Sequence, residues 1–208
     1  MEQVQQHFES ALAPVKDYRA EYMFTQKYFR LRSKGRVTQS VIREPRAFLF
    51  EFAPDFRINH LHMLSSGGKV CLRRDERTYA AMGSGAFRAA GVQVMAVDDP
   101  RSNFPCGESF NNLNLFELVP RLKWYRQNGK VSVDLVRIGA MICPRIIMER
   151  TTPPQPGELQ KLTVALNPET WLPVRVEYLD NLDAEGYTVL DYQTLKTNLG
   201  LKEEDLKF

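Results

Sequence analysis

Alternation with a period of two residues dominates this sequence, and the longest alternating run is Asp17–Phe29. Tyr18, Tyr22 and Phe24 fall on one side of the run, while mostly charged or polar residues fall on the other. Successive side chains of a β-strand point to opposite faces of a sheet, and aromatic residues are enriched in strands. The run therefore predicts one strand of about twelve residues, with one face turned toward an apolar interior.

Shorter runs of the same kind predict further strands along the chain. They cover residues 36–44, 46–52, 61–65, 69–73, 78–82, 92–96, 131–138, 142–150, 159–166, 174–178 and 187–195. Ser33-Lys34-Gly35 and Ser66-Gly67-Gly68 have the composition of hairpin turns. Two segments instead have helical spacing, residues 1–15 and 111–127. Pro120 fits only the first turn of a helix, so we expect the second helix to begin near Glu117.

These elements predict an α+β fold built as one domain over residues 1–208, because no linker interrupts the chain. Consecutive hairpins make an antiparallel sheet, and about nine to eleven strands are too many for a flat one. We therefore expect a strongly curved sheet, or half-barrel. The N-terminal helix and a second, lid helix would cover its concave face.

Composition excludes several classes of protein. The 28 Lys and Arg against 25 Asp and Glu give a net charge of +3, too little to indicate nucleic-acid binding. No apolar run is long enough for a transmembrane helix, and residues 1–15 do not resemble a signal peptide. Residues 16–57 are nevertheless basic and residues 176–208 acidic. These segments are either ordinary solvated faces or complementary surfaces, within the fold or toward a partner.

Motifs for catalysis or cofactor binding are not found. The sequence has no phosphate-binding loop, dinucleotide fingerprint or nucleophile elbow, and its three cysteines fit neither a disulfide framework nor a zinc pattern. His60 and His62 would point to the same side of an extended segment, but a metal would need a third ligand such as Asp55 or Asp75. We expect exposed loop histidines here, no cofactor, no metal and no enzyme activity.

Aromatic side chains carry more information. They gather on predicted strand faces, as in Phe48, Phe50 and Phe52, and again at Tyr178 and Tyr192. They either fill the core completely or leave an apolar pocket that suits acyl chains, depending on how fully two helices cover the sheet.

Four segments resemble the LolA/LppX-like superfamily of bacterial envelope proteins. They are DYRAEYMFTQKYF, REPRAFLFEFAP, LNPETWLPVRVEYLD and GYTVLDYQTLKTNLGLKEEDL. The resemblance is best over residues 1–60 and 130–208, and its most specific part is the run from Asn167 to Pro173. It is closest to an uncharacterised branch of that superfamily. The resemblance implies a half-barrel with helices over an apolar cavity.

The resemblance implies a non-catalytic protein of the periplasm or cell envelope that holds a lipid or the acyl chain of a lipoprotein. Such a role is compatible with peripheral contact with a membrane. Ligand-lining residues would be Tyr22, Phe24, Phe48, Phe50, Phe52, Leu115, Phe116, Val119, Leu122, Trp124, Trp171, Tyr178 and Tyr192. Arg46 and Arg57 at the rim would meet an anionic head group. The alternative is an envelope protein-interaction or stress-sensing module with a filled core, and a third hypothesis is a His60–His62 metal-dependent enzyme.

Overall fold

The computed structural model of the chain covers most of both terminal thirds of the sequence and parts of the middle. It describes residues 2–28, 31–53, 56–58, 69–72, 78–82, 91–96, 112–152, 159–179 and 186–206. For residues 28, 31, 57, 58, 69–72, 78–82 and 95 the backbone alone is described. The predicted strand at 61–65 and the turn at 66–68 lie outside these residues.

Two α-helices, twelve strands and two 3₁₀ helices are formed by the described residues. The helices are α1 (Glu2–Leu12), η5 (Leu115–Glu117), α2 (Leu118–Asn128) and η6 (Glu203–Leu206). The strands of the first half are β1 (Asp17–Tyr28), β2 (Leu31–Ile42), β3 (Ala47–Phe52), β4 (Arg57–Ile58), β5 (Lys69–Leu72), β6 (Thr78–Met82) and β7 (Val92–Ala96). Those of the second half are β8 (Gly129–Ile138), β9 (Met141–Arg150), β10 (Lys161–Leu166), β11 (Pro173–Leu179) and β12 (Tyr187–Thr197).

All twelve of these strands belong to one antiparallel sheet. Its order is β7-β6-β5-β3-β2-β1-β12-β11-β10-β9-β8, and the two-residue β4 pairs with β2 beyond the end of β3. The first and last long strands, β1 and β12, therefore meet in the middle and join the two halves of the chain. The predicted α+β half-barrel is confirmed. The described strands number twelve, one more than the nine to eleven expected, and of these only the two-residue β4 was not predicted.

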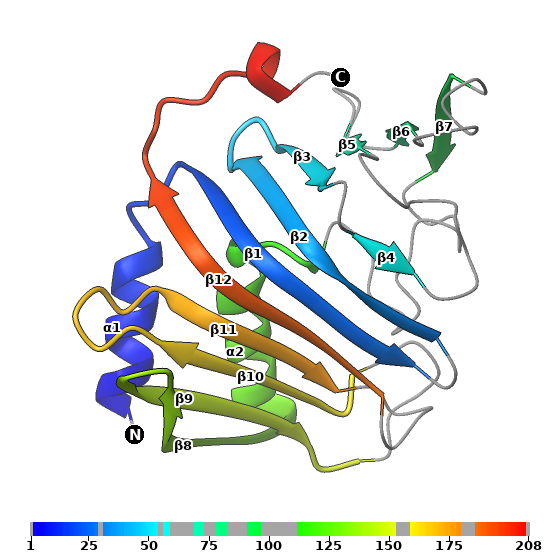
Figure 1. Cartoon of the computed structure of the whole chain (residues 1–208). Helices are drawn as coiled ribbons and strands as arrows, with labels where there is room; N and C mark the ends of the chain where they lie inside the picture. Colours follow the sequence, from blue (N-terminus) through cyan, green and yellow to red (C-terminus); the bar gives the residue numbers. More distant parts are fainter. Residues whose placement is uncertain are drawn as a thin grey trace.

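Both helices lie on the same side of the sheet, behind it in Figure 1. We call the sheet face toward α1 and α2 the inner face. Phe8 and Leu12 of α1 and Leu118 and Leu122 of α2 belong to one buried cluster together with side chains of the inner face. Neither helix is long and apolar enough to cross a membrane, within the part of the chain that the structure describes.

Alternation along β1 follows the predicted pattern closely. Tyr18, Tyr22 and Phe24 are at most 1% exposed on the inner face, whereas Arg19 and Glu21 are exposed on the opposite face. Apolar burial on this scale is the main source of stability in a domain of this size. The sequence period thus directly decides which side of the strand the helices cover.

The predicted turn at Ser33-Lys34-Gly35 is wrong, because these residues lie inside β2. Gly35 pairs with Phe24 of β1. A Cβ atom at Gly35 would stand 2.3 Å from the Cα atom of Phe56. The glycine is therefore required because the backbone of another segment approaches it closely, which is a common reason for glycine within a strand.

Helix α2 begins where Pro120 indicated. Its N-cap residue is Glu117, so Pro120 falls in the first turn, where a missing N–H costs no hydrogen bond. Asn114 caps the preceding η5 by accepting a hydrogen bond from the N–H of Phe116, at 2.9 Å. The N-terminal helix is shorter than the predicted 1–15 and ends at Leu12, just before Ala13-Pro14.

A second, small apolar cluster lies on the outer face of the sheet. Ile42, Ala47 and Leu49 are covered there by Leu206 of η6 and by the partly buried Leu201. The C-terminal segment reaches this place after β12, with the backbone N–H groups of Leu199 and Gly200 bonded to the Asp17 carboxylate. The tail therefore covers the outer face at one end only.

Candidate functional site

The candidate ligand-lining residues lie mainly in the interior between the inner face and the helices. Tyr22, Phe24, Phe48, Phe50, Phe52, Leu115, Leu122 and Tyr178 are each at most 2% exposed and belong to one cluster. Ring contacts connect several of them, including the edge-to-face pair Phe48–Phe50 at 5.2 Å between centroids. The structure thus brings these eight residues together, as a packed interior.

The other five candidates lie toward the margins of this interior. Phe116, Val119, Trp171 and Tyr192 are partly buried against the cluster. Trp171 stacks on His7 of α1, with 4.5 Å between ring centroids. Trp124 is 39% exposed, and the guanidinium of Arg150 lies over its ring at 4.6 Å. Trp124 therefore belongs to the surface of α2 rather than to the interior.

The two predicted head-group residues have different surroundings. Arg46, just before β3, forms an ion pair with Glu117, the N-cap residue of α2. This pair attaches the start of α2 to the sheet, so Arg46 is already engaged by a carboxylate. The backbone of Arg57 lies in β4, and its side chain lies outside the described part of the chain.

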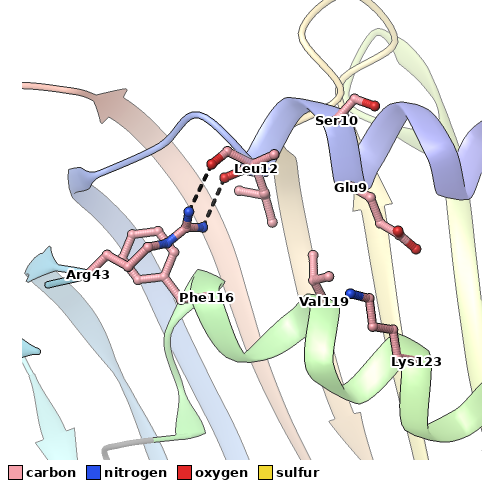
Figure 2. A pocket seen from close by; sticks show the side chains of 8 residues that line it. Glu9, Ser10, Leu12, Arg43, Phe116, Val119 and Lys123 are labelled. Atoms are coloured by element: carbon pink, nitrogen blue, oxygen red, sulfur yellow. Dashed lines mark hydrogen bonds between the residues drawn. The ribbon is translucent and has the colours of Figure 1, made fainter.

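An open groove runs between α1 and the η5–α2 segment, and Figure 2 shows the side chains that line it. It has a volume of about 300 Å³, the lower end of the usual range for small-molecule sites. Leu12, Phe116 and Val119 give it an apolar lining, and Glu9, Ser10, Ala13, Arg43 and Lys123 complete it. Of these eight residues, only Phe116 and Val119 were predicted.

Arg43 fixes one end of this groove. Its guanidinium donates hydrogen bonds to the carbonyl oxygens of Leu12 at 3.0 Å and Ala13 at 2.9 Å (Figure 2). It also lies 4.3 Å from the centroid of the Phe116 ring. A cation is favoured at the C-terminal end of a helix, where carbonyl groups lack partners. Arg43 is the first residue of the motif REPRAFLFEFAP, the one sequence signal that could have indicated it.

A few polar contacts attach the η5–α2 segment to the sheet. The Leu115 N–H donates to the hydroxyl of Tyr18 at 3.1 Å, and the Gln39 side chain donates to the Leu113 carbonyl at 3.0 Å. At the far end of α2, the Tyr125 hydroxyl donates to the Leu159 carbonyl at 3.3 Å. These contacts lie beside the apolar cluster and orient the helix on it.

Three tyrosines on the inner face, Tyr18, Tyr22 and Tyr192, keep neutral hydroxyl groups. Burial is the main cause that raises the pKa of Tyr18 and Tyr22 well above the ordinary value, and the nearby Tyr192 raises it further. Burial also raises the pKa of Tyr192. Desolvation disfavours the charged form of a buried group. The inner face thus presents aromatic rings and neutral hydroxyl groups to the helices.

Two more grooves occur in the described part of the structure. One, of about 660 Å³, is lined largely by polar side chains of α1 with Arg126 and Val131. The other, of about 360 Å³, lies between Ile42 and the C-terminal tail. Neither is lined by the aromatic residues of the inner face.

The candidate metal ligands from the sequence lie outside the described residues. They are His60, His62, Asp55 and Asp75. Among the residues that the structure does describe, no group of three His, Cys, Asp or Glu side chains is placed to hold a metal ion. The basic and acidic segments lie side by side, since β1 of the first pairs with β12 of the second.

Comparison with known proteins identifies the fold. No protein-family model and no curated protein matches the sequence. An uncharacterized conserved protein from Thermus thermophilus is similar over 100% of this chain and 92% of its own, with 11% identity and a TM-score of 0.53. The lipoprotein LppX of Mycobacterium tuberculosis is similar over 96% of each chain, with 12% identity and a TM-score of 0.50.

The chain has a LolA/LppX-like fold. A LolA superfamily protein from Nitrosomonas europaea also aligns over 100% of this chain and 97% of its own, with 8% identity and a TM-score of 0.43. The similarity to LppX confirms the fold that the four sequence segments implied. Function does not follow from a fold alone and has to be argued from the site.

Proposed function

We propose that this protein is a non-catalytic binding protein of the bacterial cell envelope that holds an acyl chain of a lipid or lipoprotein between the sheet and α2. The observation that carries the proposal is the groove between α1 and α2. Leu12 belongs to the buried cluster, and Phe116 and Val119 pack against it. An acyl chain that entered along these three side chains would meet the interior aromatics once α2 moved outward.

Energetics support reversible binding. Burial of an acyl chain contributes about 0.8 kcal/mol per CH₂ group. Against this, the η5–α2 segment has to be displaced from its contacts with Tyr18, Gln39 and Arg46. A ligand shifts such an equilibrium only by its differential affinity for the two states, and a long acyl chain supplies a large one.

Charge at the groove supports an anionic head group. Lys123 lies at the groove without an ion pair to any described residue, and Arg43 holds the other end (Figure 2). A phosphate or carboxylate near Lys123 would gain a charge-assisted hydrogen bond. Envelope location is supported by the fold shared with LppX, which is itself a lipoprotein.

Titration of delipidated protein with a fluorescent fatty acid, at concentrations where the ligand is monomeric, tests the proposal. Val119→Asp should weaken binding about tenfold or more, because it places a carboxylate against the acyl chain. Leu199→Asp, at a residue that is 46% exposed outside the groove, is the matched control and should bind like the native chain. Circular dichroism checks that both variants fold.

Absence of binding in the native chain would overturn the proposal, as would equal binding by the Val119→Asp and Leu199→Asp variants. Lys123→Gln adds a finer measurement. It should weaken binding of a fatty acid a few-fold and leave binding of the matching uncharged alcohol unchanged.

The interaction module is the second candidate, and the tight packing of the interior favours it. The largest fully buried side chains include Tyr18, Tyr22, Phe24 and Phe50, all from the inner face. A filled core needs no ligand for stability. Native mass spectrometry of protein purified without detergent separates the candidates: a bound lipid supports the carrier, and its absence together with a negative titration supports the module.

A further inference from the structure

The β8–β9 hairpin ends in a tip where several large apolar side chains are exposed. We define the hairpin tip as residues 135–142, which include the two-residue turn Gly139-Ala140. Leu135 is 70% exposed, Ile142 56% and Met141 38%, while Val136 and Ile138 are half-buried. Large apolar side chains gathered at this exposure mark an interaction site more often than a solvated surface.

Apolar residues occupy both faces of the hairpin tip. Leu135 and Ile142 lie on the same face as Ile146, which belongs to the buried cluster. Ile138 and Met141, which pair with each other, lie on the opposite face. Antiparallel strands exposed to water on one side normally carry polar residues there. A folded protein partner would cover one face of the hairpin, whereas a lipid layer surrounds both.

Charge at the hairpin tip has one sign. No carboxylate occurs between Asp134 and Glu149. Arg145 is paired with Asp134 at the base of the tip, and the exposed Arg137 has no ion pair within the part of the chain that the structure describes. Each basic residue near an anionic lipid surface contributes about 1 kcal/mol. Arg137 thus favours a membrane that contains anionic lipids.

Geometry limits how deeply the hairpin tip can enter. Leu135 precedes the turn by about 10 Å at a rise of about 3.3 Å per residue, close to the depth of about 5–10 Å that amphipathic segments reach. The pairing of β8 with β9 continues to Ile138 and Met141, so the backbone is largely bonded to the end. The other edge of β8 is the last in the sheet, and an open edge excludes entry into the hydrocarbon core.

We propose that the hairpin tip docks into the interfacial region of a membrane containing anionic lipids. In Figure 1 the hairpin lies at the end of the sheet beside the start of α1, where β9 also contacts α1. Docking here would bring the sheet margin and the N-terminal helix to the membrane surface. The proposal goes beyond acyl-chain binding and does not rest on it.

Flotation with vesicles tests the proposal. One set is phosphatidylcholine alone, and the other has equal parts of phosphatidylcholine and phosphatidylglycerol. We expect binding to the anionic set that weakens as salt rises. The double variant Leu135→Ser/Ile142→Ser should lose at least about tenfold in affinity, because two exposed apolar side chains no longer leave water. Arg137→Gln should lose about fivefold, the equivalent of about 1 kcal/mol.

The matched control is Val92→Ser/Val94→Ser in β7, at the opposite end of the sheet. These valines are 50% and 49% exposed, so both double variants remove exposed apolar area without touching the core. The control should bind like the native chain. No binding by the native chain, or equal loss in both double variants, would overturn the proposal.

Sedimentation of the lipid-free protein gives a second decisive measurement. A dimer that forms in the native chain and disappears in Leu135→Ser/Ile142→Ser would mean that a second copy covers the hairpin tip, and it would overturn the membrane assignment. A monomer in both supports it. Because the fatty-acid titration uses monomeric ligand and no vesicles, this proposal and the proposed function can fail independently.

Discussion

The interior beneath the helices and the β8–β9 hairpin tip are both apolar, but they contribute to different properties of the molecule. Phe50 in the interior is fully buried, while Leu135 at the tip is 70% exposed, although both lie in strands of the same sheet. Apolar area removed from water stabilises the fold. Apolar area that stays in water adds nothing to folding and remains available for binding. Burial, rather than residue type, separates the apolar residues that stabilise the fold from those that stay exposed at the hairpin tip.

Truncating one apolar side chain in each region should show the largest difference in stability between the interior and the hairpin tip. Phe50→Ala should lower the free energy of unfolding by about 3–5 kcal/mol, because it removes buried area and leaves a cavity. Leu135→Ala should change it by less than about 0.5 kcal/mol. Urea denaturation of both variants measures the difference. Similar losses would mean that the hairpin tip is buried in solution and that the contrast is wrong.

The hydrogen bonds that attach the η5–α2 segment to the sheet should have a smaller effect on stability, and two tyrosines of β1 allow a closer comparison. Tyr18 and Tyr22 lie on the same face of β1 and are equally buried, but only the Tyr18 hydroxyl accepts the Leu115 N–H. Tyr18→Phe leaves that donor without its partner and should cost about 1–3 kcal/mol. The Tyr22 hydroxyl makes no hydrogen bond to a described residue, so Tyr22→Phe should lower the free energy of unfolding by less than Tyr18→Phe.

Amide exchange locates this effect. In Tyr18→Phe the Leu115 amide should exchange faster while amides in β1 and β12 keep their protection, because the loss is confined to the helix layer. Faster exchange throughout the sheet would show that the hydroxyl supports the whole fold instead. Such a result would also remove the physical basis for α2 moving independently.

Much of the fold could be predicted from the sequence because local patterns decide it. The period of two in β1 follows from which residues can face an apolar interior, and Thr78–Met82 was predicted with the bounds that β6 has. The start of α2 could be predicted because proline is tolerated in the first turn of a helix, and Pro120 lies in that turn. Each of these inferences needs only residues close together in the chain.

Long-range packing accounts for what could not be predicted. Gly35 has the local appearance of a turn, and only the approach of Phe56 explains why a strand needs glycine there. Arg43 acts on the end of α1, some thirty residues away, at Leu12 and Ala13. Phe48, Phe50 and Phe52 of the candidate site share one face of β3, as their alternation indicated, whereas Trp124 lies on the surface of α2. Whether the phenylalanines line a cavity depends on how two helices pack, which alternation does not encode.

The polar base of the hairpin tip gives the smallest expected effect. Arg145 donates two hydrogen bonds to the Asp134 carboxylate, at 2.9 and 2.6 Å, and this lowers the pKa of Asp134. A lowered folded-state pKa stabilises the fold above the unfolded value of about 3.9, and the contribution is lost as pH falls through the folded value. Because both side chains are partly exposed, solvent screening limits it to about 1 kcal/mol or less.

Asp134→Asn measures this contribution through its pH dependence. The variant should be slightly less stable than the native chain at pH 7, and the difference should vanish as the pH falls through the lowered pKa of Asp134, because the native carboxyl is then also protonated. A difference that persists in acid would mean that Asp134 acts through packing rather than charge. Vesicle binding should not weaken at pH 7, since the variant removes no basic or apolar side chain from the proposed contact.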